Sequence, residues 1–160
     1  MQLPVHTVSA AALISRGDEV LLIKNPRRGW EFPGGMVDQG ESIIAGLLRE
    51  IREETGLEVK VTAFVGAYSN KTIKQGYGPL DGTTLPTSLN LTFLCEYISG
   101  EVEISDESLD AKWVSREEAR QMVTFPAFVQ RIEDMLNFDG KVNFSAFLHG
   151  DESATENFRV

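Results

Sequence analysis

The 160-residue sequence contains a single cysteine, Cys95, which lies inside an apolar run. One cysteine cannot form an internal disulfide, so a fold held by such bridges is excluded, and this thiol is predicted to be a buried core residue. The sequence also lacks an apolar stretch of the roughly 20 residues that a membrane helix needs. Its start lacks the charged and apolar regions of a signal peptide. We therefore expect a cytoplasmic protein without membrane contact.

Basic residues are also few, with 15 Lys and Arg against 24 Asp and Glu, a net charge of −9 and a pI near 4.7. No basic stripe stands out, which disfavours a nucleic-acid polymer as a partner. An anionic small molecule would need metal ions and local Arg or Lys side chains to dock. The hydrophobic fraction of 42% is enough for one compact domain with a core.

The most informative feature that is present is a run of glycines and carboxylates between Gly34 and Leu57. From Gly35 it follows the pattern G-x5-E-x7-R-E-I-x-E-E-x-G-L. The segment Glu41 to Thr55 is predicted to be one helix. Glu41 or Ser42 suits its N-terminus, where an anion or acceptor is favoured. Gly56 suits its end, where glycine adopts the left-handed conformation without steric cost.

Two faces of this helix have different chemistry. At about 100° per residue, an apolar arc is predicted to face the core, and it comprises Ile44, Leu47, Leu48 and Ile51. Glu50, Glu53 and Glu54 are spaced i, i+3 and i+4, so they share a neighbouring arc where like charges repel. A bound cation would offset that repulsion, and several hard oxygen ligands suit Mg²⁺, Mn²⁺ or Ca²⁺ rather than zinc.

Two neighbours of these carboxylates are candidates for supporting roles. Gly34 and Gly35 allow the backbone to approach a ligand closely, and a carbonyl there can turn inward as a metal ligand. The planar fork of Arg49 can orient one catalytic carboxylate by a bidentate bond. A plain surface pair between Arg49 and Glu53 is the alternative.

The whole pattern resembles the Nudix box, the signature of the Nudix hydrolases, with every position present. The resemblance implies a mixed-sheet α/β/α sandwich and hydrolysis of a nucleoside diphosphate linked to another moiety, with Mg²⁺ or Mn²⁺ as cofactor. It implies metal ligation by Glu50, Glu53, Glu54 and the Gly35 carbonyl, with Glu53 or Glu54 also touching the attacking water. It further implies that Arg49 positions Glu53. The residues that it makes structural are Gly34, Glu41 and Gly56.

Other site residues are expected outside the box. Families of this kind often place a general base or last ligand on a later loop, and the acidic candidates are Glu101, Glu103, Asp106, Glu107 and Asp110. We favour Glu107, with a solvent-facing loop acid as the alternative. Lys24, Arg27 and Arg28 precede the glycines and are candidates to meet phosphates. Tyr68 and Tyr77 are candidates to stack on a base or ribose. A solvated basic turn and simple packing are their respective alternatives.

Period-two patterns predict strands at 5–15, 19–24, 30–32, 58–68, 89–97 and around Trp113-Val114. Residues 70–87 are predicted to be a long loop or an extended hairpin tip. A short helix is predicted after the capping box Ser115-x-x-Glu118, and another over 128–136. These elements give a mixed-sheet α/β/α sandwich over residues 1–140. Residues 141–160 are expected to form a tail, for which packing on the domain or on a partner subunit and a fraying terminus are the alternatives. A homodimer is one expected assembly.

The prediction is a metal-dependent hydrolase that cleaves a pyrophosphate bond in a nucleoside triphosphate, an oxidised nucleotide or a nucleotide sugar. ADP-ribose pyrophosphatase activity is one alternative. A nucleotide-binding Nudix regulator without catalysis is another, although such proteins usually lose box carboxylates. A Nudix-fold isomerase would need cysteine chemistry in the pocket, and RNA decapping is disfavoured by the acidic charge.

Overall fold

The structure is a computed structural model that describes residues 3–76, 78–148 and 151–160. Its main sheet contains nine described strands in the order β11-β10-β5-β8-β1-β2-β3, with β4 added beside β1 and β9 beside β2. The strand bounds are β1 Thr7–Arg16, β2 Glu19–Asn25, β3 Gly29–Glu31, β4 Gly34–Met36, β5 Glu58–Asn70, β8 Ser88–Ser99, β9 Asp110–Ser115, β10 Asn143–Leu148 and β11 Asp151–Arg159. The sheet is mixed, because β1 runs parallel to β8 and β10 parallel to β5 while the other pairs are antiparallel.

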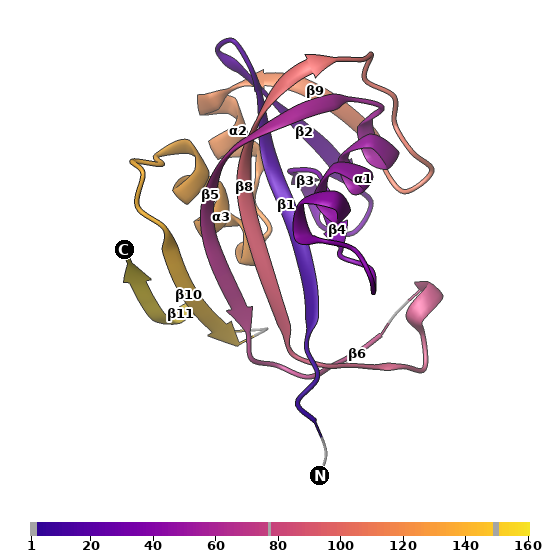
Figure 1. The fold of residues 1–160 in the computed structure, drawn as a ribbon, viewed down its shortest axis with the longest axis vertical. Helices are drawn as coiled ribbons and strands as arrows, with labels where there is room; N and C mark the ends of the chain where they lie inside the picture. The colour runs from indigo at the N-terminus through magenta and orange to yellow at the C-terminus, as the bar shows by residue number, and fades with distance from the viewer. Residues whose placement is uncertain (1–2, 77, 149–150) are drawn as a thin grey trace.

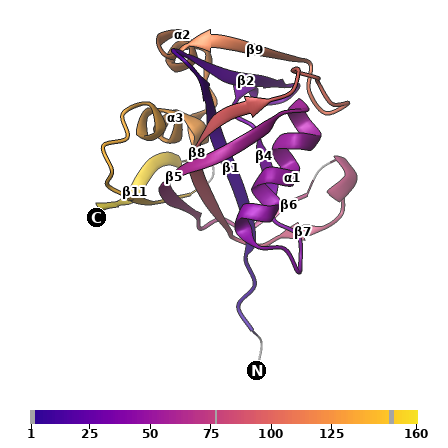
Figure 2. The ribbon, with the colours of Figure 1, turned by 45° about the horizontal axis from the view of Figure 1, so that its top comes forward.

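Helices cover both faces of this sheet (Figure 1 and Figure 2). Helix α1, Ile43–Thr55, packs on one face, while α2, Arg116–Met122, and α3, Pro126–Leu136, pack on the other. Each face has its own core, one including Leu47, Ile51 and Cys95 and the other including Val65 and Ile132. The predicted α/β/α sandwich with a mixed sheet is therefore confirmed. Cys95 is 1% exposed, which confirms it as a core thiol.

Helix α1 begins and ends at the residues that its sequence indicates. The Ser42 hydroxyl accepts a hydrogen bond from the Ala45 N–H at 3.1 Å, and Gly56 is left-handed with φ 72°. Leu47 and Ile51 are fully buried, but Ile44 is 40% exposed, so its assignment to the core face was wrong. Ile44 lies in the first turn of the helix, where Ile43 is also 40% exposed.

Other boundaries differ slightly from the prediction. Helix α3 begins at Pro126, two residues before the predicted start at residue 128. Proline is tolerated in the first turn of a helix, because the N–H that it lacks would have no partner within the helix there. The segment 70–87 contains a small hairpin of β6, Lys74–Gln75, and β7, Thr84–Leu85, with a 3₁₀ turn at Gly78–Leu80. The capping box is present in full at Ser115 and Glu118.

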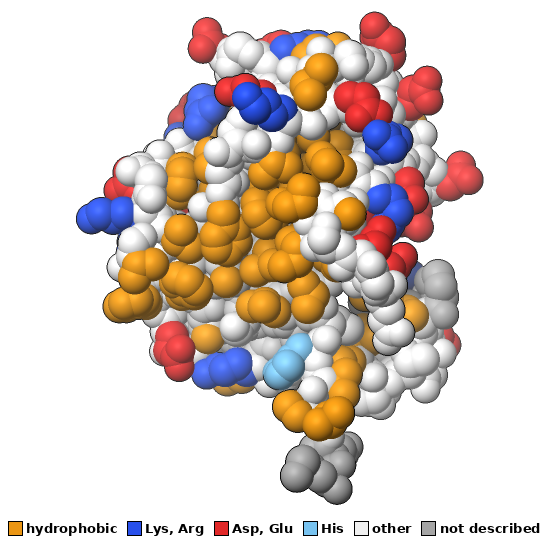
Figure 3. Space-filling model, in the orientation of Figure 1, with side chains coloured by type: hydrophobic (Ala, Val, Ile, Leu, Met, Phe, Trp, Pro, Cys, Tyr) orange, Lys and Arg blue, Asp and Glu red, His pale blue; other side chains and the backbone are white. Residues whose placement is uncertain are grey.

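The last strands extend the sheet at its edge. Strand β10 pairs with β5, and β11 pairs with β10, so part of segment 141–160 lies on the domain. Phe144 is opposite Ala67 in one pair and Phe158 in the other, so these side chains share the α1 face. They are 42% and 63% exposed, and hydrophobic side chains gather on this side of the molecule (Figure 3). The domain boundary at residue 140 and the homodimer stay predictions.

Within the described ranges, no helix combines the length and the apolarity that crossing a membrane requires.

Candidate active site

Helix α1 places its carboxylates beside β4, Gly34–Met36, which lies against β1. Together they border a cleft of about 590 Å³, here called the acidic cleft. The described residues that line it are Asn25, Arg28, Gly34, Gly35, Met36, Asp38, Glu50, Glu53, Glu54, Ser105, Asp106 and Glu107. The three box glutamates and Glu107, far apart in the sequence, therefore face one space.

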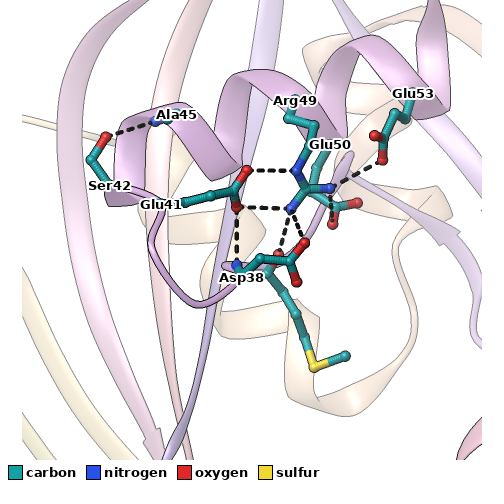
Figure 4. A network of polar contacts seen from close by, with 8 residues as sticks. Asp38, Glu41, Ser42, Ala45, Arg49, Glu50 and Glu53 are labelled. Atoms are coloured by element: carbon teal, nitrogen blue, oxygen red, sulfur yellow. Dashed lines mark hydrogen bonds and ion pairs between the residues drawn. The ribbon is translucent and has the colours of Figure 1, made fainter.

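Arg49, in the middle of α1, is the centre of a polar network that joins the helix to the loop before it (Figure 4). Its Nε and Nη2 donate to the two oxygens of Glu41 at 2.7 and 3.0 Å. Its Nη1 donates to Glu50 at 2.9 Å and to Glu53 at 3.1 Å. Nη2 also donates to the Met36 carbonyl at 3.1 Å.

The bidentate bond of Arg49 thus goes to Glu41, so the expectation that it would go to a catalytic carboxylate was wrong. The Asp38 N–H donates a hydrogen bond to Glu41 at 3.0 Å and so fixes the carboxylate that Arg49 binds. The side chain of Glu53 is instead 60% exposed, where water competes for its oxygens. The Arg49 hydrogen bond and the Asp38 N–H lower the pKa of Glu41 to about 2. Arg49 also offsets part of the repulsion among the glutamates, which sequence reasoning had left wholly to a cation.

Glu54 is the most enclosed carboxylate of the cleft. Its Oε2 accepts a hydrogen bond from the Gly34 N–H at 2.8 Å. Burial, with smaller contributions from the charges of Glu31, Glu50 and Glu107, raises the pKa of Glu54 to about 8 despite that hydrogen bond. A carboxylate in this state favours either a proton or a cation.

Glu50 lies against the backbone of Gly35. A Cβ on Gly35 would collide with the Glu50 carboxylate, so any larger residue at this position would displace that carboxylate from where it lies. Burial raises the pKa of Glu50, although Arg49 opposes that shift. A Cβ on Gly34 would likewise collide with Ala10 and Ala11 of β1.

The donor set fits a hard divalent cation, since several carboxylates and Gly35, which has only backbone atoms to offer, border one cleft. Among the described residues, however, no three acidic, His or Cys side chains converge closely enough to hold a metal ion as they stand. Arg49 binds Glu50 and Glu53, and the Gly34 N–H binds Glu54. Each of these bonds uses a single oxygen of its glutamate, so the second oxygen of each side chain can bind a cation while these bonds persist.

The structure narrows the candidates for an acid outside the box from five to two. Asp106 and Glu107 line the acidic cleft. The backbone N–H of Glu103 instead bonds the Thr55 carbonyl at 3.0 Å, at the far end of α1. Asp110 pairs with Lys112 at 3.4 Å, and Glu101 is exposed outside the described cleft lining.

Of the predicted substrate-binding residues, the structure places one in the acidic cleft. Arg28 lines the acidic cleft and binds the buried Glu31 through two bonds, at 2.7 and 2.8 Å. Lys24 is not among the described residues of that lining, and its ammonium lies 5.7 Å from the Trp30 ring. Tyr77 lies outside the described residues, so its role stays a prediction.

A second cleft of about 660 Å³, here called the aromatic cleft, shares Arg28 with the first. Its described lining combines three rings, several amides and hydroxyls, and four cationic side chains. Among them are Phe125, Phe128, Asn70, Asn90, Arg28 and Arg131.

Sequence reasoning missed Arg131 and Glu31. Arg131 had a visible signal, because it falls three residues after Phe128 and four before Met135, on the apolar face of α3. A charge at such a position indicates either a buried partner or a ligand site. Glu31 lies in a three-residue strand, which carries too little periodicity to reveal a buried acid.

Comparison with known proteins identifies the family. The model of the NUDIX domain matches residues 5–134, so the chain belongs to the Nudix family and the predicted resemblance is confirmed. A MutT-like protein of Streptomyces ambofaciens is 31% identical over 139 residues, covering 86% of this chain and 81% of that protein.

The NAD-capped RNA hydrolase NudC of Pseudomonas aeruginosa is 38% identical over 121 residues, or 71% of this chain. The match spans only 38% of the length of NudC. Among solved structures, a mutator MutT protein from Bacillus halodurans superimposes with a TM-score of 0.72 at 23% identity, covering 96% of this chain and 97% of that one. This last similarity supports the fold.

Proposed function

We propose that the protein is a divalent-metal-dependent pyrophosphohydrolase that cleaves a nucleoside diphosphate linked to another moiety. The observation that carries this proposal is the acidic cleft, in which Glu50, Glu53 and Glu54 of α1 face Glu107 of a distant loop. Similarity to NudC and to MutT-like proteins supports the same class of reaction.

Each group of residues has a part in the proposed reaction. Glu50, Glu53, Glu54 and the Gly35 carbonyl would hold Mg²⁺ or Mn²⁺ against the pyrophosphate. The bound cation would offset charge on the phosphate oxygens and acidify water. Glu107 accepts a proton from the water that attacks phosphorus, and Glu53 or Glu54 orients that water. Arg49 positions Glu50 and Glu53 through the bonds it makes to both.

Arg28 connects the two halves of the substrate site. It borders both the acidic cleft and the aromatic cleft, so a pyrophosphate in the first leaves its nucleoside room in the second. Its guanidinium is held by Glu31, which fixes its orientation at that junction. The position suits a contact with a phosphate oxygen.

The experiment that tests this proposal is a hydrolysis screen with Mg²⁺ and with Mn²⁺. The substrates are nucleoside triphosphates, oxidised dGTP, ADP-ribose, NAD and dinucleoside polyphosphates, with the products identified by chromatography. We expect cleavage of a pyrophosphate bond in at least one of them and its loss on chelation. Ligand-induced thermal shifts with no cleavage of any substrate would instead favour a binding regulator.

A further inference from the structure

Arg131 is a buried cation with an unused donor. Its residue is 5% exposed, and its Nε donates to the Thr92 hydroxyl at 2.9 Å. Within the described part of the chain, its Nη2 is shielded from solvent and has no hydrogen-bond partner. A buried donor without an acceptor is costly, and such atoms in a fold call for an explanation.

The surroundings of Arg131 stabilise its charge without supplying an acceptor for Nη2. The guanidinium lies 4.9 Å from the ring centre of Phe32 and 5.5 Å from those of Tyr68 and Phe128. Among the described ion pairs, none includes Arg131, and the nearby acid Glu31 is engaged by Arg28. Burial lowers the pKa of Arg131 to about 10, which leaves it protonated at neutral pH.

The cleft beside Arg131 suits a planar ring. Phe125 and Phe128 form a tilted pair at 5.2 Å on its wall, and the amides of Asn70 and Asn90 lie on the same lining. Aromatic walls with a few polar groups are typical of sites for a nucleobase. Phe128 and Arg131 both line this cleft, and the Phe128 ring centre lies 5.5 Å from the guanidinium, so the aromatic wall and the cation border the same space.

We propose that Arg131 selects the nucleobase: its guanidinium, which lines the aromatic cleft and has no acceptor for Nη2 among the described residues, donates a hydrogen bond to a carbonyl oxygen of a base held in that cleft. Arginine is only a donor, so an exocyclic carbonyl completes its bonding, while an exocyclic amino group places a donor against a donor. The enzyme then prefers a 6-oxopurine over a 6-aminopurine. This inference rests on the proposed function for the identity of the substrate but is tested by binding.

The test uses IDP and ADP, which differ in the six-position group that Arg131 would contact. Their affinities are measured by calorimetry with Mg²⁺, so turnover is not required. In the unmodified protein we expect IDP to bind at least about tenfold more tightly than ADP. In Arg131→Met the ratio should fall to about one, while Arg131→Lys, which keeps a cationic donor, should retain part of the preference.

The matched control is Arg120→Met, because Arg120 pairs with Glu133 outside the described cleft lining. It should leave the ratio unchanged. Equal affinities in the unmodified protein, or no binding of either nucleotide, overturn the proposal even if Arg131→Met fails to fold. An unaltered ratio in a folded Arg131→Met protein overturns it as well. If IDP is preferred but no nucleotide is hydrolysed, the proposed function fails while the role of Arg131 stands.

Discussion

Arg49 binds both carboxylate oxygens of Glu41, through Nε at 2.7 Å and Nη2 at 3.0 Å, and thereby ties the loop before α1 to the middle of the helix. Lysine keeps the charge but cannot reproduce this fork together with the bonds to Glu50 and Glu53. We expect Arg49→Lys to weaken Mg²⁺ affinity or turnover about tenfold to a hundredfold. Titration of activity with Mg²⁺ measures the effect.

Arg52→Lys is the control for that variant, since Arg52 lies on the same helix but pairs with the exposed Glu58 at 2.7 Å. An equal loss in both variants would mean that the charge and stability of α1, rather than the fork of Arg49, govern activity.

Leu47 and Ile44 test the orientation of α1 on the sheet. Leu47 is fully buried, and we expect Leu47→Ala to lower the free energy of unfolding by about 2–5 kcal/mol. Ile44 is 40% exposed, so Ile44→Ala should cost less than about 1 kcal/mol. Denaturant titration of both variants compares them. Similar losses would show that the helix presents its first turn to the core after all.

The sequence predicted the elements that have long periodic patterns or explicit caps. Ser42, Gly56, Ser115 and Glu118 mark helix ends because their side chains or conformations satisfy orphan backbone groups locally. Ile44 was misplaced because helical periodicity gives an angle around the axis but does not tell which turns of the helix are covered by neighbouring elements.

The site was predicted in part for the same physical reason. The spacing of Glu50, Glu53 and Glu54 on one helix is local information. The partner of Arg49 and the approach of Glu107 depend on how loops close, which no pattern in one chain specifies. Arg131 was missed although an arginine on an apolar helix face is a visible anomaly.

Glu54 should make stability depend on pH in the absence of metal. Its pKa in the folded protein is about 8 against an ordinary value of 4.5, so the native state binds more protons than the unfolded state between these values. Its contribution to stability is therefore present at low pH and is lost as the pH rises through this interval. We expect thermal midpoints in EDTA to fall with pH more steeply for the unmodified protein than for Glu54→Gln.

Mg²⁺ should remove this difference in slope, because a cation bound to Glu54 takes the place of the proton. Glu58→Gln, which alters an exposed acid, serves as control. Parallel curves for Glu54→Gln and the unmodified protein in EDTA would show that Glu54 is ionised without a cation.

Glu107 should act on turnover rather than on folding, because it is an exposed loop residue that faces the cleft. Removal of a general base costs about 10²–10⁴-fold in rate, so we expect Glu107→Gln to lower kcat within that range. Glu103→Gln, on the same loop but at the far end of α1, should be nearly unaffected. Steady-state kinetics give the kcat of both variants. A normal kcat for Glu107→Gln would show that Glu107 is not the general base, and Asp106 would then be the next candidate.

The most direct test of the account is the turnover of Glu53→Gln on the best substrate of the hydrolysis screen, measured with saturating Mg²⁺. The Glu53 side chain is 60% exposed, so the substitution should leave the fold and the thermal midpoint intact. We expect turnover to fall at least about a hundredfold, with Glu58→Gln unchanged. A folded Glu53→Gln protein with near-normal turnover would contradict the claim that the box carboxylates carry the chemistry.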